Sequence, residues 1–220
     1  MNLSRREVLG SSLAVLAGSV VPTMAYAQET TYGAALTGSG ITKSFATFLS
    51  GIRYEDLPPA AVHEAKRAVL DWIGCALAGS THPTVGITIA TFQALGSGPM
   101  SSVLGHRRLK LGLLDAPVAN GQMGHILDFD DTHLGGVILH TSTATLPALF
   151  TLGEWRKASG RDLIVALAAA FEAGIRVGQA ATSHHLAGWH LTGTLGTVAA
   201  AAGSARRVGL TGEQTTFALG

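Results

Sequence analysis

The sequence is poor in cysteine, in aromatic residues and in charge, and each scarcity excludes a class of protein. A single cysteine, Cys75, cannot form an internal disulfide or a cysteine-rich metal site. Because it lies in the apolar run WIGCALAG, we expect a buried and unreactive thiol. Lys and Arg number 15 against 14 acids, without a basic stripe, so nucleic acid is not an expected partner. The short basic stretch 106–110 is expected to be a solvated turn.

Alanine and glycine supply much of the apolar content, which reaches 47% although aromatic residues make up only 6%. Such small side chains predict helices that approach one another closely. Beyond the first residues, charge, Gly or Pro interrupts every apolar run before it reaches the roughly 20 residues of a membrane span. We therefore expect one helical domain and no transmembrane bundle.

The N-terminal residues 1–27 have the composition of an export signal. Arg5 and Arg6 form a twin-arginine pair, a weakly hydrophobic run follows, and a small-x-small cleavage motif runs from Ala25 to Ala27. We expect cleavage after this motif, the twin-arginine export machinery as a partner, and a periplasmic protein without stable membrane insertion. An uncleaved membrane anchor is the alternative, disfavoured because the run is short and broken by proline.

Residues 28–220 are predicted to form an all-α, multi-helix bundle-like domain, because apolar positions recur at helical spacing and no convincing strand pattern occurs. Proline opens and glycine closes the first strong helix, over 58–80. Further helices are predicted over 85–95, 113–125, 142–157, 162–180 and 194–206. Thr211 and Gln214 form a capping box for another helix just before the chain ends, so we expect the natural chain to continue.

The window 125–140, HILDFDDTHLGGVILH, gathers acids and histidines in an otherwise apolar stretch. No Lys or Arg occurs between Lys110 and Arg156, so these carboxylates have no basic partner nearby in the sequence. Burying so many titratable groups is costly unless they are used, which indicates a functional site. The titratable residues of the window are His125, Asp128, Asp130, Asp131, His133 and His140.

The spacing of these residues suggests how they come together. If the helix over 113–125 continued through residue 129, His125, Asp128 and Thr132 would share one face. The following Gly-Gly pair allows a turn that would return His140 toward this face. Such a cluster can bind a metal, perform acid–base chemistry or cap a helix end.

Two alternatives to acid–base chemistry stay open from the residues alone. A metal-dependent hydrolase could use a cluster of His125, Asp128, Asp131 and His133. Asp130 and His133, taken singly, are equally well explained as a turn cap and a surface residue. The second explanation accounts poorly for the whole cluster, since so many titratable groups in an apolar surrounding are costly unless they are used.

A second polar segment, SHHLAGWHLTGT, spans 183–194. Its two adjacent histidines are expected in a solvated loop. His190, Thr192 and Thr194 stand near the start of a predicted helix, where free backbone N–H groups favour anions. This arrangement predicts a carboxylate-bearing ligand.

Three segments of the chain resemble the MmgE/PrpD family, which includes 2-methylcitrate dehydratase and cis-aconitate decarboxylase. They are RYEDLPPAAVHEAKRAVLDWIGCALAGS, ANGQMGHILDFDDTHLGGVILHTSTATLPAL and EAGIRVGQAATSHHLAGWHLTGTLGTVAAAAGSARRVGL. The DFDDTH element is specific, and the order and spacing of the others support it. The resemblance implies an all-helical domain whose active site is completed by a smaller lid domain, expected beyond residue 220.

The resemblance also implies a site without metal or organic cofactor. The catalytic positions that it implies are Asp128, Thr132, His140 and His190. Further contacts with substrate are expected from Asp131, His133, Thr192 and Thr194. Thr141 and Leu191 stand where the family usually has proline, which changes backbone stiffness beside two of these positions.

The expected activity is that of a hydro-lyase, a carbon–oxygen lyase that dehydrates a 2-methylcitrate-like hydroxy-polycarboxylate. His140 or His190 would act as acid and base, since imidazole titrates near neutral pH. Asp128 would orient a histidine, and Thr132 would hydrogen-bond the substrate. Decarboxylation of a cis-aconitate-type substrate and epimerisation are alternatives in the same pocket.

The small apolar helices predict a homodimer in this family. The cations that a polycarboxylate needs are expected outside residues 28–220, so this part alone is expected to have little activity. A non-enzymatic alternative is a truncated module that dimerises but does not turn over substrate.

Overall fold

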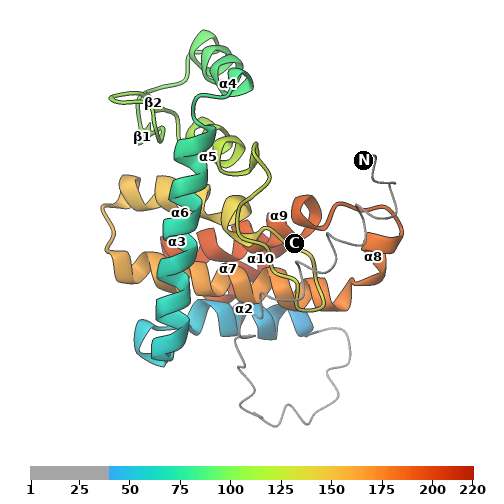
Figure 1. Ribbon diagram of the computed structural model, residues 1–220. Helices are drawn as coiled ribbons and strands as arrows, with labels where there is room; N and C mark the ends of the chain where they lie inside the picture. The colour runs from blue at the N-terminus through green and yellow to red at the C-terminus, as the bar shows by residue number, and fades with distance from the viewer. Residues whose placement is uncertain (1–39) are drawn as a thin grey trace, which may run out of the picture. The chain divides into compact units, whose positions relative to one another are not determined.

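Helices make up most of residues 40–220, the part of the chain described by the structure, a computed structural model (Figure 1). This part contains nine α-helices, one 3-10 turn and one two-stranded hairpin, which confirms the predicted all-α class. In chain order the elements are α2 (Ile41–Gly51), η1 (Tyr54–Asp56), α3 (Pro59–Gly79), α4 (Pro83–Ala94), β1 (Ser101–Ser102), β2 (Lys110–Leu111), α5 (Asp115–His125), α6 (Thr141–Arg156), α7 (Gly160–Ala180), α8 (Ser183–Leu186), α9 (Leu191–Val208) and α10 (Gly212–Leu219).

The predicted export signal, residues 1–27, lies outside the described residues. Its twin-arginine pair, Arg5 and Arg6, and its cleavage motif from Ala25 to Ala27 therefore stay predictions. The periplasmic location, the export machinery and the homodimer stay predictions as well.

The six helices predicted between residues 58 and 206 fall on α3, α4, α5, α6, α7 and α9. α9 begins at Leu191, earlier than the predicted Thr194, because the His190 side chain caps it by accepting the Gly193 N–H at 3.3 Å. The hydrophobic pattern did not reveal α2, whose N-cap Gly40 makes no side-chain hydrogen bond. It did not reveal the hairpin either, since two residues per strand are too few to alternate.

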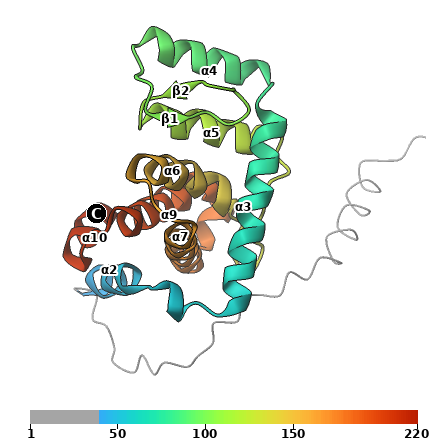
Figure 2. The same ribbon diagram turned by 90° about the vertical axis from the view of Figure 1, so that its left-hand side faces the viewer.

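The helices are stacked, with α3 along one side of the stack. In Figure 2, α4, the hairpin, α5, α6, α9, α7 and α2 follow one another from top to bottom. α3 contacts α5, α6 and α7, so it joins several layers. At the other side α10 packs on α2, where the Ser50 and Thr215 hydroxyls lie 2.9 Å apart.

Small residues allow α7 and α9 to lie close together, as the composition predicts. A Cβ atom added to Gly203 of α9 would lie 2.9 Å from the Ala170 Cβ and 3.1 Å from the Ala166 carbonyl oxygen of α7. Contacts this short cannot be accommodated without a shift of backbone or neighbours. Glycine at this position therefore sets the distance between the two helices.

α7 is long and apolar enough, by length and composition, to cross a membrane. As expected from the sequence, charge and glycine still interrupt its apolar run, at Glu172, Gly174 and Arg176. Half of its most apolar window is buried within the domain, and Ala169 and Ala173 belong to an internal apolar cluster. Glu172 and Arg176 form the predicted ion pair on its surface. These features are typical of a core helix.

The main core lies where α3, α5 and α6 meet. Trp72 of α3 is fully buried and packs on Phe150 of α6, with ring centroids 5.1 Å apart. Met123 and Leu146 are also fully buried in this cluster. This packing fixes the end of α5 against the start of α6, and the polar window joins these two ends.

Cys75 is buried beside this core and is free, as predicted. Burial, together with the nearby charge of Asp71, raises the pKa of its thiol to about 11. The thiol is therefore protonated and unreactive at neutral pH.

Candidate active site

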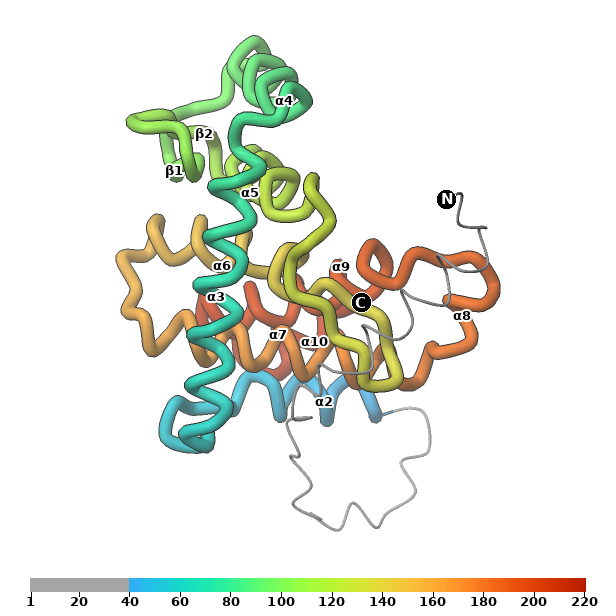
Figure 3. Tube along the Cα trace, viewed as in Figure 1, coloured from blue at the N-terminus to red at the C-terminus, as the bar shows by residue number. Residues whose placement is uncertain are grey.

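The polar window forms a loop between two helix ends rather than the extended helix considered above. α5 ends at His125, and the chain runs through 126–140 before α6 begins at Thr141 (Figure 3). Asp128 has a backbone φ of 54° and donates its N–H to the His125 carbonyl at 2.9 Å. A left-handed residue cannot continue an α-helix, so the expectation of helix through residue 129 is wrong.

Asp130 is the buried centre of this loop. Its side chain is 0% exposed, and its Oδ1 atom lies 2.9 Å from the His125 Nδ1 atom. Its Oδ2 atom lies 3.4 Å from the His140 Nδ1 atom. The two imidazole rings meet edge to face with centroids 4.7 Å apart. One carboxylate thus positions both histidines, a role that the sequence did not reveal because Asp130 alone is equally well explained as a turn cap.

The hydrogen bonds around His140 favour one tautomer. The Thr132 hydroxyl donates to the Asp130 carbonyl at 3.2 Å and lies 3.3 Å from the His140 Nδ1 atom. Because its proton is used on the carbonyl, this hydroxyl can accept a proton at Nδ1. With the proton at Nδ1, the Nε2 atom of His140 is left for a ligand or for proton transfer. Thr132 contacts His140 here, and its expected hydrogen bond to substrate stays a prediction.

The hydrogen bonds described for Asp131 go to Ser142 and Asp71 and not to the two histidines. Its Oδ2 atom accepts the Ser142 hydroxyl at 2.7 Å, and its backbone N–H donates to Asp71 at 3.0 Å. Burial raises the pKa of the Asp131 carboxyl to about 6, with repulsion from Asp71 and Asp130 adding to the rise and the Ser142 bond opposing it. Asp131 therefore ties the loop to α6 and α3, and its expected contact with substrate stays a prediction.

Asp71 is a site residue that the sequence did not indicate. It lies on the exposed side of α3, sixty residues before its partner in the chain. Only the packing of α3 against the window brings the two together.

His133 makes its contacts within its own loop, and its expected contact with substrate stays a prediction. Its Nε2 atom lies 3.3 Å from the Gly135 carbonyl of its own loop, and its backbone pairs with Leu139. The predicted metal cluster is therefore wrong in Asp131 and His133. Within residues 40–220 the ligand atoms that lie within 4.8 Å of one another belong to His125, Asp128 and His140.

The second polar segment meets the first through Thr192. The buried Thr192 hydroxyl accepts the His140 N–H at 3.1 Å and so joins the starts of α9 and α6. Thr194 bonds instead to the carbonyls of His190 and Leu191 in its own helix, both at 3.3 Å. Both threonines thus have structural partners, and their expected contacts with substrate stay predictions.

His190 is exposed and does not belong to the pair around Asp130. Its Nδ1 atom takes the Gly193 N–H at the start of α9. One of the backbone donors expected to hold an anion is therefore already occupied. A catalytic role for His190 stays a prediction.

Gly124 lets the end of α5 approach the core closely. A Cβ atom at this position would lie 2.4 Å from the Trp72 Nε1 atom and 2.8 Å from the Thr143 hydroxyl. The next residue is His125, so the glycine helps to fix the direction in which this histidine leaves the helix.

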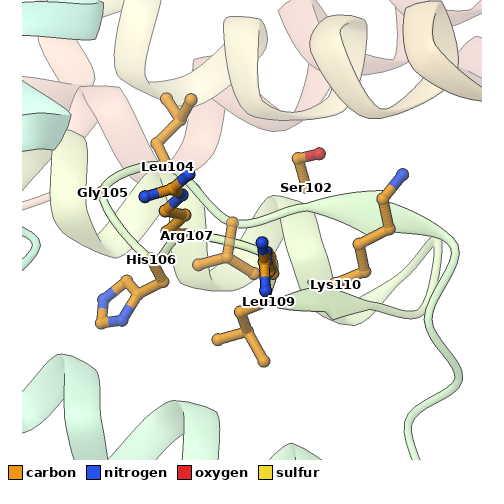
Figure 4. Close-up of a pocket in the computed structure, with 9 residues that line it drawn as sticks. Ser102, Leu104, Gly105, His106, Arg107, Leu109 and Lys110 are labelled. Carbon is orange, nitrogen blue, oxygen red and sulfur yellow. The ribbon is translucent and has the colours of Figure 1, made fainter.

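A separate hollow lies on the hairpin, away from these residues in the chain. It measures about 410 Å³ and is lined by residues 102–110, whose side chains are shown in Figure 4. Arg107 and Arg108 are exposed there, and the His106 Nε2 atom lies 3.0 Å from the Ser80 carbonyl. The predicted solvated turn is confirmed, with His106 docked on the end of α3.

Comparison with known proteins defines the class of this domain. The MmgE/PrpD N-terminal domain matches residues 43–220, and the chain belongs to this family.

Several curated relatives carry a more specific name. The cis-aconitate decarboxylase-like protein oryM of Aspergillus oryzae is 33% identical over 82% of this chain and 39% of its own length. A cis-aconitate decarboxylase of Aspergillus terreus is 30% identical over 83% of this chain and 38% of its own. The cis-aconitate decarboxylase of Homo sapiens is 31% identical over 81% of this chain and 38% of its own length. The chain spans about two fifths of the length of these relatives.

Proposed function

We propose that the protein carrying this chain is a cofactor-independent decarboxylase of an unsaturated tricarboxylate of the cis-aconitate type. Dehydration of a 2-methylcitrate-like acid is the first expectation from sequence, with decarboxylation as its alternative. The names of the relatives support the alternative, so we reverse this order. Both reactions need a positioned proton donor, and the loop between α5 and α6 offers one.

Decarboxylation breaks the bond between a carboxylate carbon and the adjacent carbon. CO₂ leaves without the bonding electron pair, which stays on the substrate as a carbanion. A proton must then form the new C–H bond. In our proposal His140, in its doubly protonated form, gives the proton from Nε2 and afterwards regains one from solvent.

The observation that carries this proposal is the buried Asp130 carboxylate behind His140. The fully buried Asp130 carboxylate lies 3.4 Å from the His140 Nδ1 atom, and the Thr132 hydroxyl lies 3.3 Å from the same atom. The Nε2 atom is thereby left as the proton donor. His190 has no carboxylate partner among the described ion pairs, so we assign proton donation to His140.

The remaining members of the loop support this donor. Asp128 is exposed, and its carboxylate lies within 4.8 Å of ligand atoms of His125 and His140. In our proposal it orients one of these rings. His125 shares the buried Asp130 and is the second candidate for proton transfer.

CO₂ release from cis-aconitate by the natural full-length protein tests this assignment. The variant His140→Gln should lower kcat by about 10²- to 10⁴-fold, the usual contribution of a general acid. His63→Gln is the matched control, because His63 is exposed on α3 and outside the loop. A rate for His140→Gln within a few-fold of the wild type would refute the role of His140.

Substrate choice is tested with the same protein. Dehydration of 2-methylcitrate without CO₂ release from cis-aconitate would return the hydro-lyase to first place and overturn the proposed decarboxylation.

A further inference from the structure

Three side chains of the loop are arranged as metal ligands usually are. One ligand atom from each of His125, Asp128 and His140 lies within 4.8 Å of the other two. Ligand atoms around a tetrahedral zinc ion are roughly 3.3–3.5 Å apart, since Zn–N and Zn–O bonds are about 2.0–2.2 Å. Side-chain shifts of about an ångström would close the difference. Asp128 is exposed, so its carboxylate has room to make such a shift.

The buried Asp130 provides the second, independent observation. Histidines that bind metals almost always donate their other ring N–H to a carboxylate or carbonyl, which fixes the tautomer. Asp130 lies at the Nδ1 atoms of both His125 and His140, so the Nε2 atoms are left for a ligand. Its Oδ2 atom, 3.4 Å from the His140 Nδ1 atom, is buried and makes no hydrogen bond with the described residues. An added positive charge beside it would stabilise this oxygen.

The local charge also favours a cation. The loop brings Asp128, Asp130 and Asp131 together, and Asp71 of α3 joins them through the Asp131 N–H. The sequence contains no Lys or Arg from 111 to 155. Within the described ion pairs, these four acids have only histidine as a possible cationic partner.

We propose that His125, Asp128 and His140 bind a divalent cation of the zinc type, and that the bound ion blocks the site. Two imidazole nitrogens and one carboxylate oxygen suit Zn²⁺ in an open, three-ligand site. The inhibitory part rests on the proposed function, because a metal on His140 Nε2 takes the electron pair that would carry the proton. Binding of the metal itself does not depend on that function.

Calorimetric titration of the metal-free protein with Zn²⁺ alone tests the binding. We expect one tightly bound equivalent in the wild type and in the surface control His63→Gln. His125→Gln and Asp128→Asn should each bind at least tenfold more weakly. Asp130→Asn, which changes only the outer partner, should weaken binding by about 10- to 100-fold. Equal affinity in all variants, or no bound equivalent, would overturn the site.

A spectrum of the wild type loaded with Co²⁺ keeps the test independent of whether the variants fold. The intense visible absorption of tetrahedral Co²⁺, lost on addition of Zn²⁺, supports the site. A weak octahedral spectrum contradicts the three-ligand geometry.

Inhibition is measured separately, with free Zn²⁺ held by a metal buffer so that chelation by the tricarboxylate is not mistaken for inhibition. CO₂ release should fall as the single site fills. Unchanged or increased release at full occupancy would overturn the inhibitory part. Zinc binding without any decarboxylation in the metal-free protein would refute the proposed function alone, and decarboxylation without zinc binding would refute the metal site alone.

Discussion

Replacing Asp131 by Asn should change how the stability of the domain depends on pH. The Asp131 carboxyl has a pKa raised to about 6 in the folded protein, against an ordinary value of 3.8, chiefly because it is buried. Below about pH 4 the group is protonated in both states and its ionisation costs nothing. As the pH rises from about 4 to about 6, the unfolded chain ionises first, so folding becomes less favourable. Above about pH 6 the cost is complete.

The size of this cost follows from the two pKa values. A difference of about two units corresponds to about 3 kcal/mol, since one unit is about 1.4 kcal/mol. The amide of Asn does not titrate, so Asp131→Asn lacks this pH-dependent part. Any constant cost of the amide in a buried position is the same at each pH. It cancels when the variant and the wild type are compared across the range.

Urea unfolding of both proteins at intervals from pH 4 to pH 8 measures the effect. The free energy of unfolding of the variant, relative to the wild type, should rise by about 3 kcal/mol across this range, mostly between pH 4 and pH 6. Ser142→Ala is the companion variant. It removes the hydrogen bond that lowers the Asp131 pKa. The free energy of unfolding of Ser142→Ala should therefore fall more steeply with rising pH than that of the wild type. Parallel curves for wild type and Asp131→Asn would refute the reasoning.

Three further substitutions test the packing that holds the site. Gly124→Ala should destabilise the domain by about 1–3 kcal/mol, because the new Cβ would lie 2.4 Å from the Trp72 Nε1 atom. A melting temperature equal to that of the wild type would contradict this close approach. Thr192→Val should lower the free energy of unfolding by about 1–3 kcal/mol, because it leaves the His140 N–H without its acceptor. Urea unfolding measures this loss, and an unchanged midpoint would show that the hydrogen bond is dispensable. Leu146→Ala should cost about 2–5 kcal/mol in the same assay, since this side chain is fully buried, and a loss below 1 kcal/mol would mean that the core is loosely packed there.

The helices could be predicted from sequence because their signals are local. Pro59 at the start of α3 and the capping box of Thr211 and Gln214 at α10 lie within a few residues of the turns that they begin. The small residues of α7 and α9 likewise predicted close helix packing, and the short contacts at Gly203 confirm it. Local chemistry was enough for these features.

The internal order of the site could not be predicted in the same way. Asp130 reaches both histidines because the chain turns at Asp128 with a positive φ. The hydrophobic pattern of the sequence does not indicate this backbone conformation, which an aspartate can adopt. The bond from Asp131 to Asp71 depends on how α3 packs, sixty residues away. Sequence therefore located the window but could not tell which acid is central.

The most direct test of the central claim is the stoichiometry of cis-aconitate consumption by the natural full-length protein. If the protein is a decarboxylase as proposed, one CO₂ is released for each cis-aconitate consumed, and the product carries one solvent-derived hydrogen. Consumption without CO₂ release, or turnover only of 2-methylcitrate with loss of water, would contradict it.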